Sequence, residues 1–275
     1  MNEKLVNDLQ NIELDMLLEV DRICKKYNIQ YFLVAGTLLG AVRHKGFIPW
    51  DDDIDICLPL NDYKKFCKIC KKELDKKYFL QNYKTDITNK WPAKIRKNGT
   101  TAIEKGYETA QIHQGVWIDI FPLVGVKNDK KWITKVSKIS LFAKALLRKR
   151  NGANSKFKVL SFEKKLLKFI PVSLIKFIVS VILSFIFKHH KKYEFCTYLW
   201  GESKITPRFK SVLFSEFCEV EFEGHMFPAP KEWDKYLTIE YGDYMTPPPP
   251  EKRNGGSHTI SIVDINNNYT KYINR

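Results

Sequence analysis

Two aspartates, Asp53 and Asp55, stand two positions apart in an alternating run whose other positions are Ile54 and Ile56. Residues two apart on a β-strand project from the same face, so the carboxylates share one side and the isoleucines the other. Neighbouring carboxylates repel each other unless a cation lies between them. Mg²⁺ takes oxygen ligands and is commonly held by one or two carboxylates together with substrate phosphates. The pair therefore predicts a site for a divalent cation, Mg²⁺ or Mn²⁺.

A second strand pattern, over residues 115–121, repeats this design with Asp119 in its middle. An acidic side chain among apolar neighbours is costly to bury without a partner. A cation shared with Asp53 and Asp55 would compensate the negative charge of Asp119. The alternative is that Asp119 pairs with a lysine or an arginine and that residues 51–53 form only a turn.

A glycine and a threonine, Gly36 and Thr37, follow the apolar run 31–35 and precede a helical pattern. Unpaired backbone N–H groups at the start of a helix attract phosphate. Gly36 allows a ligand to approach the backbone, and Thr37 adds a hydroxyl group. The three features together predict a site for phosphate chemistry.

The elements that position these residues follow from hydrophobic periodicity. Helices are predicted over 4–27, 38–43, 61–77, 130–150, 156–192 and 231–241, and strands over 31–35, 53–58, 78–83, 91–97, 100–103, 116–121 and 217–222. Pro122 is expected to end the strand 116–121, and the prolines at 247–250 exclude regular structure there. The pattern predicts an α/β (α+β) fold, a mixed sheet flanked by helices. We expect a catalytic core over 1–128, a basic helical insert over 129–192, and a C-terminal part over 193–275 that completes the core.

The insert carries the excess charge of the chain. The sequence has 46 Lys and Arg against 31 Asp and Glu, a net charge of +15, while residues 130–192 alone sum to +16. Such a segment indicates an anionic partner. Its longest uncharged run, 177–187, is shorter than the about 20 apolar residues that a membrane span needs. The run is therefore expected either to lie in a core or to rest on an anionic membrane surface.

The six cysteines are sparse for 275 residues, and no secretory leader is recognised in the first twenty. We therefore expect free thiols and a cytoplasmic protein, peripheral on the inner face of the cell membrane.

The chain resembles the LicD family, which includes the fukutin-type phosphotransferases, within the polymerase β-type nucleotidyltransferase superfamily. The resemblance rests on Gly36-Thr37-Leu-Leu-Gly40-Ala-Val-Arg43-His44, then Pro49-Trp50-Asp51-Asp52-Asp53-Ile-Asp55, and near the C-terminus Tyr241-Gly242, Met245, Pro250, Arg253 and His258. It implies transfer of phosphocholine from CDP-choline to a sugar hydroxyl of a cell-surface glycan (teichoic acid, capsule or lipopolysaccharide precursor), with release of CMP. It also implies Asp53 and Asp55 as metal ligands and Asp119 as the third carboxylate, a ligand or the acceptor of the hydroxyl proton.

Other candidate residues surround this motif. Arg43 and His44 end the short helix, Lys94 and Arg96 alternate on one strand, and Trp50 and Trp117 offer rings to a quaternary ammonium. The alternatives are a solvated helix end, an exposed polar strand face and core packing. The substrate-binding candidates are Gly36, Thr37, Arg43, His44, Trp50, Asp52, Lys94, Arg96, Trp117, Arg253 and His258.

Three further functions remain open. The first is transfer of another CDP-linked group, such as ribitol, glycerol or ethanolamine phosphate. The second is a nucleotidyltransferase activity that uses an NTP. The third is nucleic-acid binding, which the charge favours. No zinc finger, helix-turn-helix or aromatic-basic strand platform accompanies that charge, so we expect no nucleic-acid partner.

Overall fold

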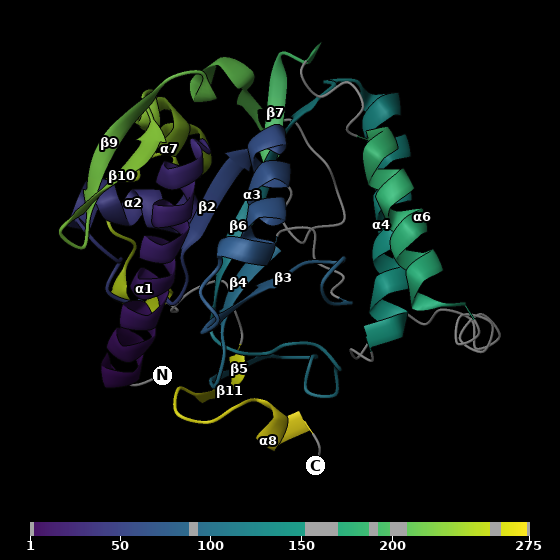
Figure 1. The fold of residues 1–275 in the computed structure, drawn as a ribbon. Helices are drawn as coiled ribbons and strands as arrows, with labels where there is room; N and C mark the ends of the chain where they lie inside the picture. The colour runs from purple at the N-terminus through teal and green to yellow at the C-terminus, as the bar shows by residue number, and fades with distance from the viewer. Residues whose placement is uncertain are drawn as a thin grey trace.

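The computed structural model describes residues 3–87, 93–151, 170–186, 192–198, 208–253 and 260–273. Helices and strands alternate along the first half of the chain (Figure 1). The helices are α1 (Glu3–Tyr27), α2 (Ala35–His44), α3 (Leu60–Glu73), α4 (Lys130–Asn151), α6 (Val172–Ile186), α7 (Trp233–Tyr241) and α8 (Thr270–Ile273), with short 3-10 turns η2 (Ser211–Phe214) and η3 (Pro250–Lys252). The strands are β1 (Phe32–Leu33), β2 (Asp55–Pro59), β3 (Tyr78–Gln81), β4 (Ala93–Lys97), β5 (Thr101–Glu104), β6 (Trp117–Val126), β7 (Phe195–Tyr198), β8 (Phe209–Lys210), β9 (Phe217–Phe222), β10 (His225–Pro230) and β11 (Ile260–Asp264).

The central sheet is mixed, which confirms the predicted fold class. Its strand order is β1-β2-β6-β4-β3, and β7 and β8 extend it from β6. Only the β2–β6 pair is parallel among the described strands. The parallel pair brings the start of β2 beside the first half of β6, where Asp55 is directly opposite Asp119. The strand register therefore juxtaposes two of the predicted site residues.

The predicted end of one strand is wrong, because β6 continues through Pro122. Backbone N–H groups alternate between the two neighbouring strands, and Asp119 N–H donates to Ile54 O on the β2 side. The nitrogen of Pro122 therefore faces the other side. There the pairing with β4 ends at Ile120 and the pairing with β7 begins at Leu123. Pro122 lies between two partner strands, at a position that needs no N–H donor.

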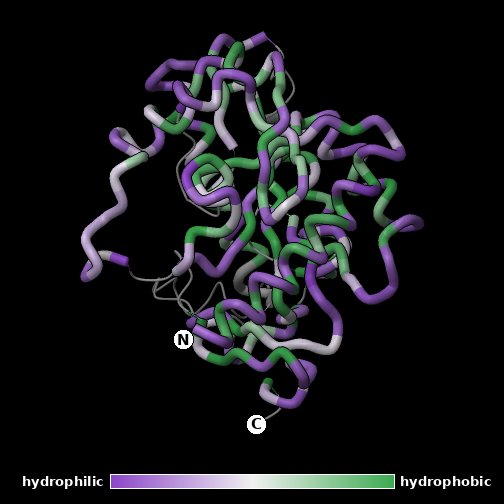
Figure 2. The backbone as a smooth tube through the Cα atoms, turned by 90° about the vertical axis from the view of Figure 1, so that its left-hand side faces the viewer, coloured by the Kyte–Doolittle hydropathy of each residue, from purple (hydrophilic) through white to green (hydrophobic). Residues whose placement is uncertain are grey.

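The helices α1 and α3 both contact β6 and cover one side of the sheet (Figure 1). Helix α1 confirms the predicted span, and its apolar stripe is buried at Leu9, Met16, Leu17 and Val20. Helix α3 ends at Glu73, earlier than predicted. In Figure 2 hydrophobic stretches gather in the middle of the molecule, and hydrophilic ones follow its outer turns.

The C-terminal part packs against the first half of the chain. Strand β7 joins β6, β11 pairs with β5, and the β9–β10 hairpin contacts β1 and α2. Helix α7 also contacts α2. This packing agrees with a C-terminal part that completes the core, while the three predicted boundaries stay a prediction.

Helices α4 and α6 lie side by side at the edge of the molecule (Figure 1). A second, smaller apolar cluster joins them to the end of β6 through Val124, Val126, Val136, Leu147 and Val179. Of the predicted helix 156–192, residues 172–186 are helical, starting after Pro171, and much of the remainder lies outside the described residues. Within the described ranges, no helix has the length and apolar character that crossing a membrane requires.

Candidate active site

The start of β2 is held by the chain segment that precedes and opens α2. Asp55 N–H donates to Thr37 Oγ1 at 2.8 Å, and Val34 N–H donates to Asp55 O at 3.1 Å. Helix α2 begins at Ala35, so Gly36 and Thr37 belong to its first turn. The Thr37 hydroxyl thus positions the Asp55 backbone, a contact that sequence reasoning did not anticipate.

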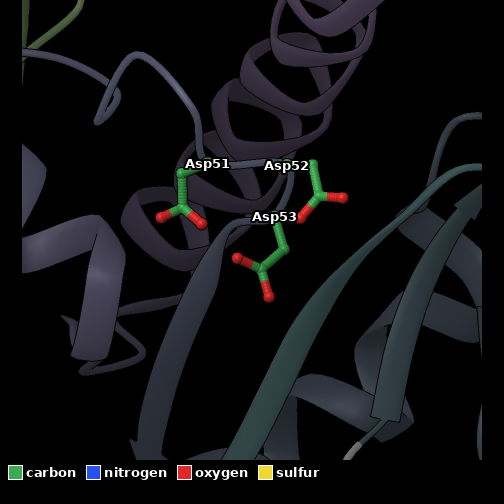
Figure 3. A group of neighbouring side chains, drawn as sticks. All are labelled: Asp51, Asp52 and Asp53. Atoms are coloured by element: carbon green, nitrogen blue, oxygen red, sulfur yellow. The ribbon is translucent and has the colours of Figure 1, made fainter. Parts of the chain in front are cut away.

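Three consecutive aspartates form a cluster just before β2 (Figure 3). One carboxylate oxygen from each of Asp51, Asp52 and Asp53 lies within 4.8 Å of the others. Burial, and then the charges of Asp53 and Asp52, raise the pKa of Asp51 well above its usual value. Burial and the charges of Asp53, Asp119 and Asp51 raise the pKa of Asp55 in the same way. The site therefore concentrates negative charge that a bound cation can compensate.

Asp119 forms an ion pair with a lysine of the neighbouring strand, Lys94. A row of polar residues in register crosses four strands, in the order Asp55, Asp119, Lys94 and Gln81. Asp119 Oδ2 lies 2.8 Å from Lys94 Nζ and accepts a hydrogen bond from Trp117 Nε1 at 3.0 Å. The alternative stated above, a lysine partner for Asp119, is thus present in the structure. Its role as a metal ligand or as the proton acceptor stays a prediction.

The Lys94–Arg96 face of β4 is buried, which excludes the alternative of an exposed polar strand face. Arg96 is 3% exposed and donates to Gln81 Oε1 and to Gly115 O, each at 2.6 Å. Lys94 Nζ lies 4.2 Å and Arg96 Cζ 4.9 Å from the centre of the Trp117 ring. A quaternary ammonium at Trp117 would therefore have to displace cations of the chain itself.

Gly36 makes room for a side chain of the protein. A Cβ atom at this position would lie 2.6 Å from Asp51 Oδ2, below van der Waals contact. The Asp51 carboxylate thus occupies the close approach to the backbone that the sequence suggested for a ligand. The preceding Ala35 has φ +50°, an unfavourable conformation for a residue with a Cβ. Its N–H donates to Tyr236 Oη at 2.8 Å, so α7 helps to hold this turn.

A second group brings together four predicted residues from distant parts of the chain. Arg43 donates to His44 Nε2 at 2.9 Å and to Tyr244 O at 2.7 Å. The Arg253 guanidinium lies 4.7 Å from the centre of the Trp50 ring, and His44 packs edge-on against the same ring. Burial and then the charge of Arg253 lower the pKa of Arg43. Two guanidinium groups near each other favour an anion between or beside them.

Trp50, on whose ring Arg253 stacks, directly precedes Asp51 and so joins this basic group to the acidic cluster. Burial raises the pKa of Tyr241, with further contributions from Glu240, Asp55, Asp51 and Asp53. The same tyrosine interacts electrostatically with Arg43. Arg253 is therefore connected to the acidic cluster through the consecutive residues Trp50 and Asp51, an arrangement that suits binding of a metal together with a phosphorylated ligand. His258, another predicted residue, lies outside the described residues.

Sequence reasoning missed Glu13, a buried carboxylate of α1. It is 2% exposed, and burial, followed by the charges of Asp53, Asp52, Asp51 and Asp55, raises its pKa well above the usual value. The signal was present in the sequence, because Glu13 stands four positions from both Leu9 and Leu17 within the apolar stripe. A charged residue inside such a stripe marks a position with a specific environment.

The residues present fit a divalent cation such as Mg²⁺ or Mn²⁺. The donors are carboxylate oxygens, which hard cations prefer. Within the described part of the chain, Asp55 Oδ1 is buried without a hydrogen-bond partner. Asp53 and Asp55 are the residues that would hold the ion beside a substrate phosphate.

Comparisons with known proteins show which proteins the chain is similar to. Residues 28–145 match the model of the LicD/FKTN/FKRP nucleotidyltransferase domain. The chain is 29% identical over 266 residues to the lipopolysaccharide cholinephosphotransferase LicD of Haemophilus influenzae, an alignment that covers 91% of this chain and 95% of the relative. It is also 50% identical over 34 residues to the ribitol 5-phosphate transferases FKRP of Homo sapiens and Mus musculus, which covers 12% of this chain and 7% of each relative. Residues 28–145 therefore carry a nucleotidyltransferase domain of LicD type, and a LicD relative aligns along nearly the whole chain.

Proposed function

We propose that the protein transfers phosphocholine from CDP-choline to a sugar hydroxyl of a cell-surface glycan and releases CMP. Its class, a phosphotransferase enzyme, follows from the family domain and from the LicD relative. The choice of phosphocholine rests on the cholinephosphotransferase activity for which that relative is named, and it aligns over 91% of the chain.

One structural observation carries the proposal: Arg253 lies 4.7 Å from the centre of the Trp50 ring, and Trp50 directly precedes the carboxylate cluster of Asp51, Asp52 and Asp53. Phosphoryl transfer depends on positioning and on neutralising the charge of the phosphates. Asp53 and Asp55 would hold a divalent cation, which would supply this neutralisation. Arg43 and Arg253 bind the remaining phosphate charge of the donor.

In the proposed reaction, the acceptor hydroxyl oxygen forms a bond to the phosphorus that carries choline. The bond from that phosphorus to the bridging oxygen breaks, and CMP leaves with the electron pair. The hydroxyl proton passes to a carboxylate or to water. Lys94 and Trp117 already bind Asp119 Oδ2, which makes this oxygen a weaker base and favours an orienting role for Asp119.

Transfer of another CDP-linked group, such as ribitol phosphate, is the second candidate. The FKRP relatives favour it, because their name states ribitol 5-phosphate transfer and they are 50% identical to this chain over 34 residues. A site built for the nucleotide diphosphate is common to both candidates. Glycerol and ethanolamine phosphate belong to the same group of donors.

The test is CMP release from a panel of CDP-choline, CDP-ethanolamine, CDP-glycerol and CDP-ribitol with Mg²⁺ and a sugar acceptor. We expect CDP-choline to react fastest. Asp55→Asn should lower its rate by at least about 1,000-fold, because several kcal/mol of charge stabilisation are lost and each 1.36 kcal/mol is tenfold. The matched control is Glu221→Gln on the exposed face of β9. Equal rates for Asp55→Asn and wild type, or no CMP from any donor, would overturn the proposal. Pyrophosphate release from an NTP would instead indicate a nucleotidyltransferase.

We also propose that the packed helices α4 and α6 dock on an anionic membrane, where a lipid-linked glycan acceptor would lie. On α6, an exposed apolar stripe at helical spacing comprises Leu174, Phe177, Val181 and Phe185. On α4, the exposed side chains of Lys131, Lys135, Lys138 and Phe142 recur at steps of three and four, so they share one face. Lysines beside exposed aromatic and aliphatic groups match the chemistry of an anionic lipid surface.

A further inference from the structure

The turn of the β9–β10 hairpin holds a glutamate in a backbone conformation that this residue rarely adopts. Phe222 pairs with His225, which leaves a two-residue turn between them. The turn residues Glu223 and Gly224 have φ angles of +50° and +73°. Positive φ at both positions matches a type I′ turn, in which asparagine or glycine is preferred at the first. The glutamate is therefore unfavourable for the hairpin, and such a conformation persists where other contacts of the residue compensate for it.

Those contacts join the hairpin to the loop that follows α2, residues 45–50, and β9 lies beside α2 (Figure 1). Glu223 N–H donates to Lys45 O at 2.9 Å, and Glu223 Oε1 accepts a hydrogen bond from Phe47 N–H at 2.9 Å. A Cβ atom at Gly46 would overlap Glu223 Oε1, so the glycine makes room for this carboxylate. Three consecutive loop residues are thus fitted to one side chain of the hairpin.

The far end of the same loop carries residues of the candidate site. Trp50 has the Arg253 guanidinium on its ring, and Asp51 begins the acidic cluster. Asp51 N–H donates to Ile48 O at 2.8 Å, which closes a turn between the anchored part of the loop and the cluster. Pro49 restricts the backbone inside this turn. A displacement of the loop at the hairpin would therefore move Trp50 and Asp51 as well.

We propose that Glu223 is a positioning residue of the active site. Its carboxylate fixes the loop 45–50 against the hairpin, and the loop in turn sets where Trp50 and Asp51 lie. Asparagine would suit the turn better, so the glutamate is explained by its effect on the loop rather than on the hairpin. The effect on the reaction rests on the proposed function, whereas the anchoring of the loop does not.

The test compares Glu223→Asn with Glu223→Gln by amide hydrogen exchange of the full-length protein. Asparagine is one methylene shorter and so loses the bond to Phe47 N–H, whereas glutamine keeps an acceptor oxygen in place. In Glu223→Asn the amides of Phe47 and Asp51 should exchange at least about tenfold faster, since a hydrogen bond to a charged group is lost. Glu223→Gln should stay within about threefold of the wild type, because one hydrogen bond remains. Glu221→Asn, on the exposed face of β9, is the matched control and should leave both amides unchanged.

Stability and turnover separate a positioning role from a purely structural one. Glu223→Asn should melt near the wild-type temperature, because the better turn offsets the lost hydrogen bond. Its kcat/KM for CDP-choline should fall about 10- to 100-fold, the effect of a slightly displaced site, and Glu223→Gln should restore most of it. Gly46→Ala displaces the Glu223 carboxylate, so it should lower kcat/KM in the wild type but not further in Glu223→Asn. A purely structural residue would lower the melting temperature and leave turnover unchanged.

Three results would each overturn the positioning role. They are unchanged exchange at Phe47, faster exchange at Phe47 but not at Asp51, and wild-type kcat/KM in Glu223→Asn. The exchange measurements need no substrate. If the wild type releases no CMP from any CDP-linked donor, the proposed function fails, while exchange at Asp51 still decides whether Glu223 holds the loop.

Discussion

Lys94 Nζ lies 2.8 Å from Asp119 Oδ2, and the two side chains are only 3% and 4% exposed. The pair occupies neighbouring register positions on β4 and β6, beside Asp55 on β2. Removal of one partner from a buried ion pair leaves an uncompensated charge in a medium that solvates it poorly. The contact therefore connects the stability of the sheet to the charge of the site.

We expect Lys94→Met to destabilise the protein by about 3–5 kcal/mol, the usual loss when one member of a buried pair is removed. Asp119→Ala should also lower the melting temperature of the metal-free protein, because Lys94 loses its partner. Three converging carboxylates alone predict the opposite sign, since removing one of them relieves repulsion. Urea unfolding of both single variants and of the double variant measures the coupling.

In a coupled pair, the double variant should lose less unfolding free energy than the two single variants lose together. A loss equal to or greater than that sum would contradict the coupling. The effect of Mg²⁺ separates the two roles of Asp119. If Mg²⁺ raises the melting temperature of wild type and of Asp119→Ala by the same amount, Asp119 is a structural partner of Lys94 and not a metal ligand.

The elements around the candidate site could be predicted in part because their sequence signals are local, although β2 begins at Asp55 and leaves Asp53 outside the predicted strand 53–58. The alternation around Asp53 and Asp55, the turn at Gly36 and the helix 4–27 each depend on residues close together in the chain. The strand face that carries Asp119 was also predicted, since period-two alternation identifies a face without its neighbours.

The features that were missed depend on residues far apart. The sequence pattern of Lys94 and Arg96 is the same whether these side chains face solvent or pack on an aromatic ring. In the structure they pack on the ring of Trp117, which lies on another strand. The stacking of Arg253 on Trp50 joins residues about 200 positions apart, so no spacing rule indicates it. Pro122 was misread for the same reason, because the gap between β4 and β7 is a property of the sheet.

Gly36→Ala tests whether the Asp51 carboxylate must approach the start of α2. The new Cβ would lie 2.6 Å from Asp51 Oδ2 and must displace that side chain. We expect a fall in cation affinity of about tenfold or more, because Asp51 loses its place in the cluster. Stability should change by less than about 1 kcal/mol, since only a side-chain end has to move. Isothermal titration with Mn²⁺ and urea unfolding measure the two effects.

Gly40→Ala on the same helix is the matched comparison. Its Cβ would meet Gly46 O at 2.4 Å, a backbone atom that cannot move without the loop. This variant should lose about 1–3 kcal/mol of stability through overpacking. Equal cation affinities in wild type and Gly36→Ala would show that the Asp51 position is not needed for binding.

His113 should make the stability depend on pH. Burial, assisted by the charge of Arg96, lowers its pKa to about 3. Its Nδ1 accepts a hydrogen bond from Gly115 N–H at 3.2 Å, which protonation would break. The unfolded chain binds a proton near pH 6.5 and the folded chain does not, so stability falls as the pH drops from about 6.5 towards 3. The contribution is at most about 1.4 kcal/mol per pH unit for one proton.

His113→Phe keeps a ring to stack on Phe79 but removes the titrating group. Its free energy of unfolding, measured with urea at pH 7, 6 and 5, should change less with pH than that of the wild type. The exposed His225 gives the control, because His225→Asn should leave the wild-type slope in place. If the unfolding free energy changes with pH by the same amount in wild type and in His113→Phe, His113 does not cause the pH dependence.

Helices α4 and α6 should bring the protein to anionic vesicles. Its exposed stripe includes Phe177 and Phe185, which are 65% and 61% exposed. Insertion of one Phe side chain contributes about 1.5–3 kcal/mol when it is fully buried, and each basic residue near the surface adds about 1 kcal/mol. The combined Phe177→Ser and Phe185→Ser variant should therefore bind at least about tenfold more weakly, since 1.4 kcal/mol is tenfold. Flotation with phosphatidylglycerol vesicles measures this binding.

The control for that experiment is Phe217→Ser. This variant removes a phenylalanine that is 60% exposed on β9, away from α4 and α6. It should float as the wild type does. Raising the salt concentration should weaken the binding of all three proteins, because salt screens the attraction between exposed lysines and lipid headgroups. If the serine variant binds the vesicles as strongly as the wild type does, the exposed stripe does not contact the membrane. Equal flotation of the wild type on neutral phosphatidylcholine vesicles would remove the charge argument, because uncharged vesicles offer the lysines no attraction.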